Sequence, residues 1–78
     1  MMIEPKIVDE FYISEHWLPV IVNDDVSHLN DHEDQMIESF LDQYPGCTFN
    51  FDHDNTSFVR DQVSGLYGDC VFLQILKF

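Results

Sequence analysis

Residues 30–44 read NDHEDQMIESFLDQY, and this stretch decides the fold that we expect for the rest of the chain. Asn30 stands where a helix would begin, because its side chain can accept a hydrogen bond from the first turn. Glu33 completes the spacing of a capping box. Apolar side chains then recur at helical spacing, at Met36, Ile37, Phe40, Leu41 and Tyr44. Because Pro45-Gly46 ends the pattern, the sequence predicts an amphipathic helix with one face in a core.

The opposite face of this predicted helix is acidic. It carries carboxylates three and four residues apart, at Asp31, Asp34, Glu38 and Asp42, which places them along one ridge. No Lys or Arg occurs between Lys6 and Arg60 to compensate them. A helix selected only for stability would carry lysines here, so the pattern indicates selection for negative potential. The simpler interpretation is a solvated face that keeps an acidic protein soluble.

The whole chain is strongly acidic, with 15 Asp and Glu against 3 Lys and Arg in 78 residues and a formal net charge of -12. This charge excludes direct binding to DNA, RNA or anionic membranes, which depends on Lys and Arg. A disordered acidic chain is excluded too, because 45% of the residues are hydrophobic and 14% are aromatic. We expect one small acidic domain over residues 1–78, cytoplasmic, with no targeting or membrane segment.

The flanking segments predict the remaining elements. Residues 1–13 have the composition of an extended arm, and Ser14 is the predicted cap of a short helix that contains Trp17 and Pro19. The last third predicts strands at 48–53, 58–64 and 69–78, separated by turns at 54–56 and 65–68. The expected fold is therefore α+β, with two short helices packed on a three-stranded antiparallel sheet in the order α-α-β-β-β.

The last predicted strand is apolar on both faces, which is typical of a central strand or of an edge strand covered by a partner. The second alternative predicts a homo-oligomeric interaction module that pairs through this strand. Cys47 and Cys70 are too few for a disulfide scaffold, and both free thiols and a cross-strand disulfide remain open.

Metal, cofactor and catalytic motifs are weak. Asp52, Asp54 and Thr56 have the rhythm of a calcium loop, but the required glycine and final glutamate are missing. His28, His32 and Glu33 resemble zinc ligands without an HExxH or CxxC context. We therefore expect neither a specific metal site nor a cofactor, and a divalent-cation-binding module is only a third hypothesis. Because nothing supplies an oxyanion hole, we do not expect an enzyme.

Three stretches together resemble a known family. They are WLP running to NDD at residues 17–25, S-x-L-x-D-x-E at 27–33, and VSGLYGD at 63–69. They resemble a largely uncharacterised family of small acidic proteins from phages, plasmids and other mobile elements. Its patterns read W…NGD-S-GL before an acidic helix, and V-T-G-L-x-G-D. Asp24 stands here where that family usually has glycine. In setting and charge, such proteins are similar to anti-CRISPR and anti-restriction inhibitors that mimic DNA.

The leading hypothesis is a phage or mobile-element protein that inhibits a host defence complex without catalysing a reaction. It would cover the basic nucleic-acid-binding surface of a CRISPR effector, or alternatively of a restriction enzyme, through acidic, DNA-mimic-like contacts. The predicted contact residues are Asp24, Asp25, Asp31, Asp34, Glu38, Asp42, Asp52 and Asp54.

Overall fold

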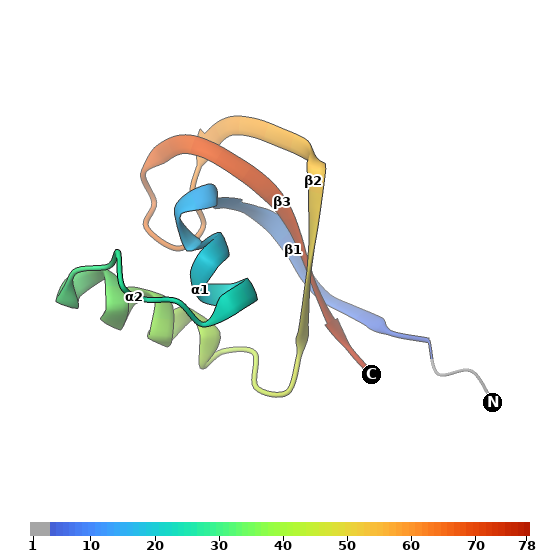
Figure 1. The fold of residues 1–78 in the computed structure, drawn as a ribbon. Helices are drawn as coiled ribbons and strands as arrows, with labels where there is room; N and C mark the ends of the chain where they lie inside the picture. The colour runs from blue at the N-terminus through green and yellow to red at the C-terminus, as the bar shows by residue number, and fades with distance from the viewer. Residues whose placement is uncertain (1–3) are drawn as a thin grey trace.

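The computed structural model describes residues 4–78 as two helices packed on a three-stranded antiparallel sheet, which confirms the α+β class (Figure 1). In chain order the elements are β1 (Lys6–Ser14), the 3-10 turn η1 (Glu15–Trp17), α1 (Leu18–Asn23), α2 (Asp31–Leu41), β2 (Thr48–Arg60) and β3 (Tyr67–Lys77). The strands lie in the order β1-β3-β2. Both helices lie on one side of the curved sheet. Across residues 4–78, none of the helices has the length and apolar character to cross a bilayer.

The predicted order of elements was wrong, because the chain runs β-α-α-β-β and not α-α-β-β-β. The expected N-terminal arm is β1, which pairs antiparallel with β3 from Lys6 opposite Lys77 to Ser14 opposite Cys70. Residues 1–3 of that arm lie outside the described residues. The strand-like composition of the segment was a valid signal, but its partner is at the other end of the chain, where local pattern does not reveal it.

The turn predicted at residues 54–56 was also wrong. Asp52 pairs with Phe72 of β3 and Thr56 pairs with the adjacent Val71, so residues 53–55 form a bulge within one continuous strand. A bulge bends its strand and interrupts the side-chain alternation, which is why the sequence pattern read as a turn between two strands. The second of those predicted strands ends at Arg60, and residues 61–66 form the connection to β3.

The last strand, β3, is the central strand of the sheet, which explains why it is apolar on both faces. Leu73 and Ile75 are fully buried on the helix side, while Phe72 packs edge-on against Tyr12 with ring centroids 5.3 Å apart. Since β3 pairs on one side with β1 and on the other with β2, a further strand could join it only by displacing one of them. Both Cys47 and Cys70 are free thiols.

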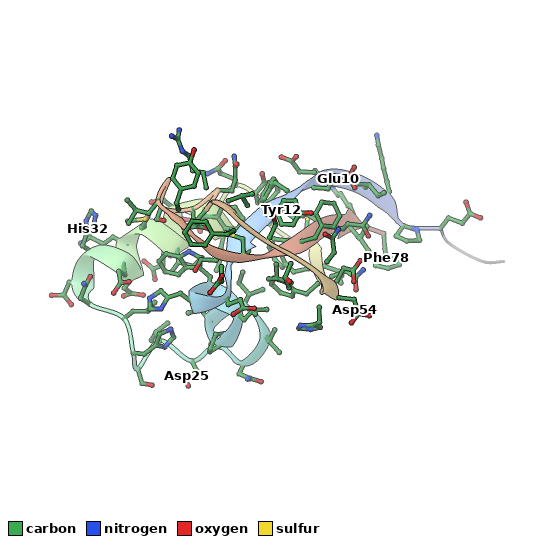
Figure 2. All side chains as sticks on the ribbon, turned by 90° about the horizontal axis from the view of Figure 1, so that it is seen from above. Glu10, Tyr12, Asp25, His32, Asp54 and Phe78 are labelled. Atoms are coloured by element: carbon green, nitrogen blue, oxygen red, sulfur yellow. The ribbon has the colours of Figure 1, made fainter. Side chains whose placement is uncertain are left out.

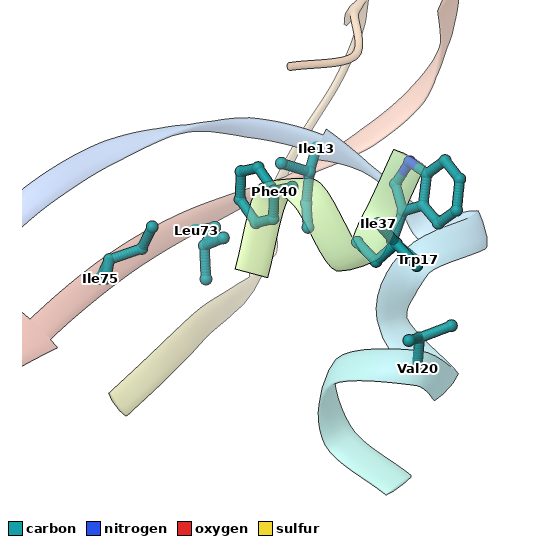
Figure 3. Packing of buried hydrophobic residues seen from close by; sticks show 7 residues of the cluster. All are labelled: Ile13, Trp17, Val20, Ile37, Phe40, Leu73 and Ile75. Carbon is teal, nitrogen blue, oxygen red and sulfur yellow. The ribbon is translucent and has the colours of Figure 1, made fainter. Parts of the chain in front are cut away.

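The hydrophobic core lies between the helices and the sheet (Figure 3). It consists of Ile13, Trp17, Val20, Ile37, Phe40, Leu73 and Ile75. The predicted apolar face of α2 is confirmed, because Ile37 and Phe40 are buried and Met36, Leu41 and Tyr44 pack against the same cluster. Trp17 is 2% exposed and lies where η1 passes into α1, with Pro19 in the first turn of that helix.

The predicted capping box at the start of α2 is confirmed. The Asn30 Oδ1 atom accepts the Glu33 N–H at 2.8 Å, and the Glu33 Oε1 atom accepts the Asn30 N–H at 3.2 Å. These two bonds satisfy backbone donors that a helix start would otherwise leave unpaired. Ser14 likewise caps η1, since its Oγ accepts the His16 N–H at 3.2 Å.

Removing the α2 cap is expected to destabilise the protein moderately. Asn30→Ala should lower the free energy of unfolding by about 1 kcal/mol and the melting temperature by roughly 4–8 °C, because Glu33 N–H loses its acceptor. Thermal melts measure the change. Gln35→Ala, at an exposed position of the same helix, is the control and should change stability by less than about 0.5 kcal/mol. Equal losses in both variants would show that the cap contributes nothing specific.

Candidate functional site

A groove of about 330 Å³ runs between α2 and the end of α1 with its following loop. Apolar side chains form its floor and walls: Val20, Val26, Ile37 and Leu41. Carboxylates form its rim: Asp24, Asp34, Glu38 and Asp42. The fold thus brings four of the eight predicted contact residues into one concave surface that also exposes apolar atoms.

Asp24 reaches this groove through an unusual backbone conformation. It caps the C-terminus of α1 with φ 54° and ψ 33°, and it is the only non-glycine residue with positive φ among residues 4–78. Its N–H donates to the carbonyl oxygen of Pro19. Glycine is favoured in this left-handed conformation because a Cβ atom is strained there. The residue turns the chain at the end of α1, so that both Asp24 and Val26 line the groove opposite α2.

The two flanks of α2 differ in charge. The flank facing the groove carries Asp34, Glu38 and Asp42. The other flank borders a hollow of about 370 Å³ whose lining contains no carboxylate and whose polar side chains include His32, Gln35 and Ser39 of α2 and Gln43 just after it. Asp34, Glu38 and Asp42 therefore lie on one side of the helix, and the groove receives their combined negative potential.

No cationic side chain neutralises the groove. Within residues 4–78 the only ion pair joins His16 Nε2 to Glu33 Oε2 at 2.7 Å. Lys6 and Lys77 lie opposite each other at one end of the β1–β3 pair. The Arg60 guanidinium lies over the Tyr67 ring, 5.3 Å from its centroid. The carboxylates on the rim are therefore available to cations from another molecule.

The other predicted contact residues lie outside the groove lining. Asp25 follows Asp24 in the loop, where its Oδ1 accepts both the hydroxyl and the N–H of Ser27 at 2.7 and 3.0 Å. The hydrogen bond from the Ser27 hydroxyl has the largest effect on this carboxyl. Together with the bond from the Ser27 N–H, it lowers the pKa of Asp25 below its usual value. Asp31 is the exposed first residue of α2.

Asp52 and Asp54 form a separate acidic site. Asp52 is the last paired residue before the β2 bulge and Asp54 lies within it, and the Asp54 N–H donates to Asp52 Oδ1 at 3.2 Å. Figure 2 shows Asp54 well separated from Asp25, toward the end of the molecule where Phe78 lies. The predicted acidic surface is therefore divided into two parts. One is the groove between the two helices, and the other is the pair Asp52 and Asp54 on the sheet.

Asp61 is a carboxylate that the sequence reasoning missed. It is 2% exposed, and it accepts three hydrogen bonds: Ser14 N–H at 2.8 Å, Trp17 Nε1–H at 2.8 Å and Ser64 N–H at 2.7 Å. Burial is the largest single influence and acts to raise the pKa of Asp61, but the bonds from Ser64, Trp17 and Ser14 together leave that pKa lowered. The ionised carboxylate joins the loop after β2 to the end of β1 and to the core. The local signals were the Asp-x-x-Ser spacing of a turn and a buried Trp that needs an acceptor.

Two of the residues considered as zinc ligands, His28 and Glu33, have other partners. His28 Nε2 lies 2.9 Å from the His16 carbonyl oxygen, and both oxygens of Glu33 are engaged, one in the capping box and one with His16. Over the described part of the chain, no three His, Cys, Asp or Glu side chains form a group that could hold a metal ion.

The groove has the chemistry to bind Lys or Arg side chains. Carboxylates on the rim can pair with their charged ends, while apolar walls can contact their aliphatic stems. Comparison of the chain with protein-family models, with curated proteins and with solved structures finds no match.

Proposed function

We propose that this protein is a non-catalytic inhibitor that binds the basic, nucleic-acid-binding surface of another protein through the groove between α1 and α2. The observation that carries the proposal is the gathering of Asp24, Asp34, Glu38 and Asp42 around one groove that has no Lys or Arg in its lining. The partner would be a host defence complex, with a CRISPR effector as the first candidate and a restriction enzyme as the second.

The arrangement suits competition with nucleic acid. Surfaces that bind DNA or RNA place Lys and Arg to meet phosphates, and the same side chains pair well with carboxylates. Asp34 and Glu38 of α2 and Asp42 at its C-cap follow one another in steps of four residues, or about 6 Å. A net charge of -12 would also accelerate encounter with a basic partner.

The groove differs from a nucleic-acid backbone in its apolar walls. Val26 is 43% exposed at the groove, so an occupant that covers it removes apolar surface from water. Such contacts distinguish one basic partner from another, whereas charge alone attracts all of them.

The resemblance to small acidic proteins of mobile elements supports a defence complex as the target. Phage and plasmid proteins of this charge are similar to inhibitors that protect incoming DNA. The chemistry of the groove itself fits any basic nucleic-acid-binding surface, including that of a host transcription protein, so the test has to include several complexes.

A displacement assay tests the proposed function. Purified CRISPR effector complexes, restriction enzymes and a host transcription protein are each loaded with a fluorescent duplex, and the acidic protein is titrated in. We expect displacement from at least one defence complex, with an apparent affinity that weakens at least roughly tenfold from low to physiological salt. Failure to displace the duplex from any defence complex at low salt would refute the proposal.

A further inference from the structure

The outer edge of β2 is protected along only part of its length. β2 is an edge strand, and an unpaired edge can accept a further strand unless charge or a bulge prevents it. Asp52, Asp54 and the bulge at residues 53–55 protect the first half. The second half, residues 56–60, reads TSFVR and has no acidic side chain.

This unprotected half carries a large apolar surface. Phe58 is 69% exposed, and at the adjoining connection and start of β3 Leu66 and Tyr67 are 71% and 65% exposed. Phe58 and Tyr67 are diagonal neighbours across the β2–β3 pair, so two exposed aromatic side chains lie beside the free edge, where a partner can cover them. Tyr and Arg are also the residue types that contribute most to protein interfaces, and here Arg60 lies over Tyr67.

The backbone shows which groups of this edge are unpaired. The Asp61 N–H donates to the Leu66 carbonyl oxygen at 2.8 Å, and Arg60 lies opposite Tyr67. In an antiparallel pair the hydrogen-bonded positions alternate, so Val59 and Ser57 direct their N–H and C=O groups toward β3. The N–H and C=O groups of Thr56, Phe58 and Arg60 therefore point away from β3 and are unpaired at the free edge of the sheet.

We propose that a second copy of this chain pairs with this edge, antiparallel, with Phe58 on the two-fold axis. Phe58 then lies opposite Phe58 of the second copy, and Thr56 lies opposite its Arg60. In each of these pairs, both residues direct their N–H and C=O groups out of the free edge. Residues 56–60 of one copy can therefore form backbone hydrogen bonds with residues 56–60 of the other. The two sheets join into one continuous sheet, and the two Phe58 side chains contact each other across the axis.

The charges favour a second copy at this edge. Arg60 is the only Lys or Arg between Lys6 and Lys77. In the proposed register it lies opposite Thr56 of the second copy, and residues 56–60 of both copies bring no carboxylate into the interface, so like-charge repulsion is small at this edge. Over much of the remaining surface, the net charge of -12 on each copy opposes association.

Light scattering over a series of protein and salt concentrations tests the dimer. We expect the mass to double as protein concentration rises, and added salt to favour the dimer because it screens the repulsion between two acidic chains. The binding of a basic partner in the groove responds to salt in the opposite direction, so the two proposals can fail separately. A wild-type protein that stays monomeric at every concentration and salt would overturn the dimer.

A matched pair of variants locates the interface. Phe58→Glu should abolish the dimer, whereas Phe78→Glu makes the same change at a residue of nearly equal exposure, 68% against 69%, and should preserve it. Equal loss in both variants would place the interface elsewhere. If the wild type is monomeric and Phe58→Glu instead weakens binding to a defence complex, then the edge binds a strand of that partner, and the proposal is wrong.

Oxidative cross-linking tests the register. In a Cys47→Ser background, two Cys side chains introduced by Phe58→Cys would have Cα atoms about 5.5 Å apart, which is within disulfide reach. Ser57→Cys is the control, because it would lie opposite Val59 of the second copy. We expect a covalent dimer from Phe58→Cys only. A dimer that cross-links equally through both positions would contradict the register.

Discussion

Replacing Asp61 with asparagine is expected to lower the free energy of unfolding by about 3 kcal/mol and the melting temperature by roughly 10–20 °C. Asp61 Oδ1 accepts one N–H and Oδ2 accepts two, and all three donors are fixed by the backbone or by the Trp17 ring. An asparagine amide has one oxygen and one NH₂ group, so either orientation places a donor against a donor. Thermal and urea unfolding measure the loss.

The effect of Asp61→Asn should depend on pH in a defined direction. The pKa of Asp61 is lowered from its ordinary value of 3.8, so the unfolded chain takes up this proton at a higher pH than the folded one. The stability that Asp61 contributes is therefore complete well above pH 3.8 and is lost as the pH falls through the lowered pKa. Asparagine does not titrate, so the difference in melting temperature between the wild type and the variant should be constant near neutral pH and shrink in acid.

Asp69→Asn is the control for both measurements, because Asp69 is an exposed carboxylate of β3. It should change the melting temperature little at any pH, since surface substitutions usually stay within about 0.5 kcal/mol. An Asp61→Asn protein that melts with the wild type, or a difference that grows in acid, would contradict the role assigned to this carboxylate.

Helix α2 could be predicted almost completely, because its determinants are local. The capping box needs only Asn30 and Glu33, and the buried face follows from the spacing of Ile37 and Phe40. The same spacing put Asp34, Glu38 and Asp42 on one flank, so half of the groove could be inferred from the sequence.

The opposite wall of the groove depends on features that periodicity does not encode. Asp24 faces α2 because one left-handed residue turns the chain at the end of α1, and Asp seldom adopts that conformation compared with Gly. Val26 is one of two apolar residues, with Leu29, in an otherwise polar loop, and nothing in its sequence neighbours indicates that it is the one that lines a groove.

The errors in the sheet have a common cause, which is pairing between residues distant in sequence. β1 is held by β3 at the other end of the chain, and the bulge at residues 53–55 is defined by its register with Phe72 and Val71. Because that segment is a bulge and not a turn, Asp52 and Asp54 lie away from the helices. Asp61 was overlooked for the same reason, since only the folded chain brings Ser14 and Trp17 to its carboxylate.

Some of the predicted contact residues line the groove and the others lie outside it, so the two sets should contribute differently to binding. Asp34→Asn, Glu38→Gln and Asp42→Asn, combined in one protein, should weaken binding to the complex selected by duplex displacement by about tenfold to a hundredfold at low salt. The same protein should be at least as stable as the wild type, because the substitutions remove repulsion of a few tenths of a kcal/mol between carboxylates four residues apart. Titration in the displacement assay and thermal melts provide the two readouts.

A second triple variant separates the position of the charges from their number. Asp31→Asn, Asp52→Asn and Asp54→Asn remove the same total charge from residues that the sequence also predicted as contacts but that lie outside the groove lining. Long-range attraction depends on net charge and should fall alike in both proteins, so association should slow to a similar extent. Direct pairing with the partner's Lys and Arg depends on position, so dissociation should accelerate only when the groove residues are neutralised. Equal losses of affinity in the two triple variants would mean that the protein acts through its total charge and that the groove is not the binding site.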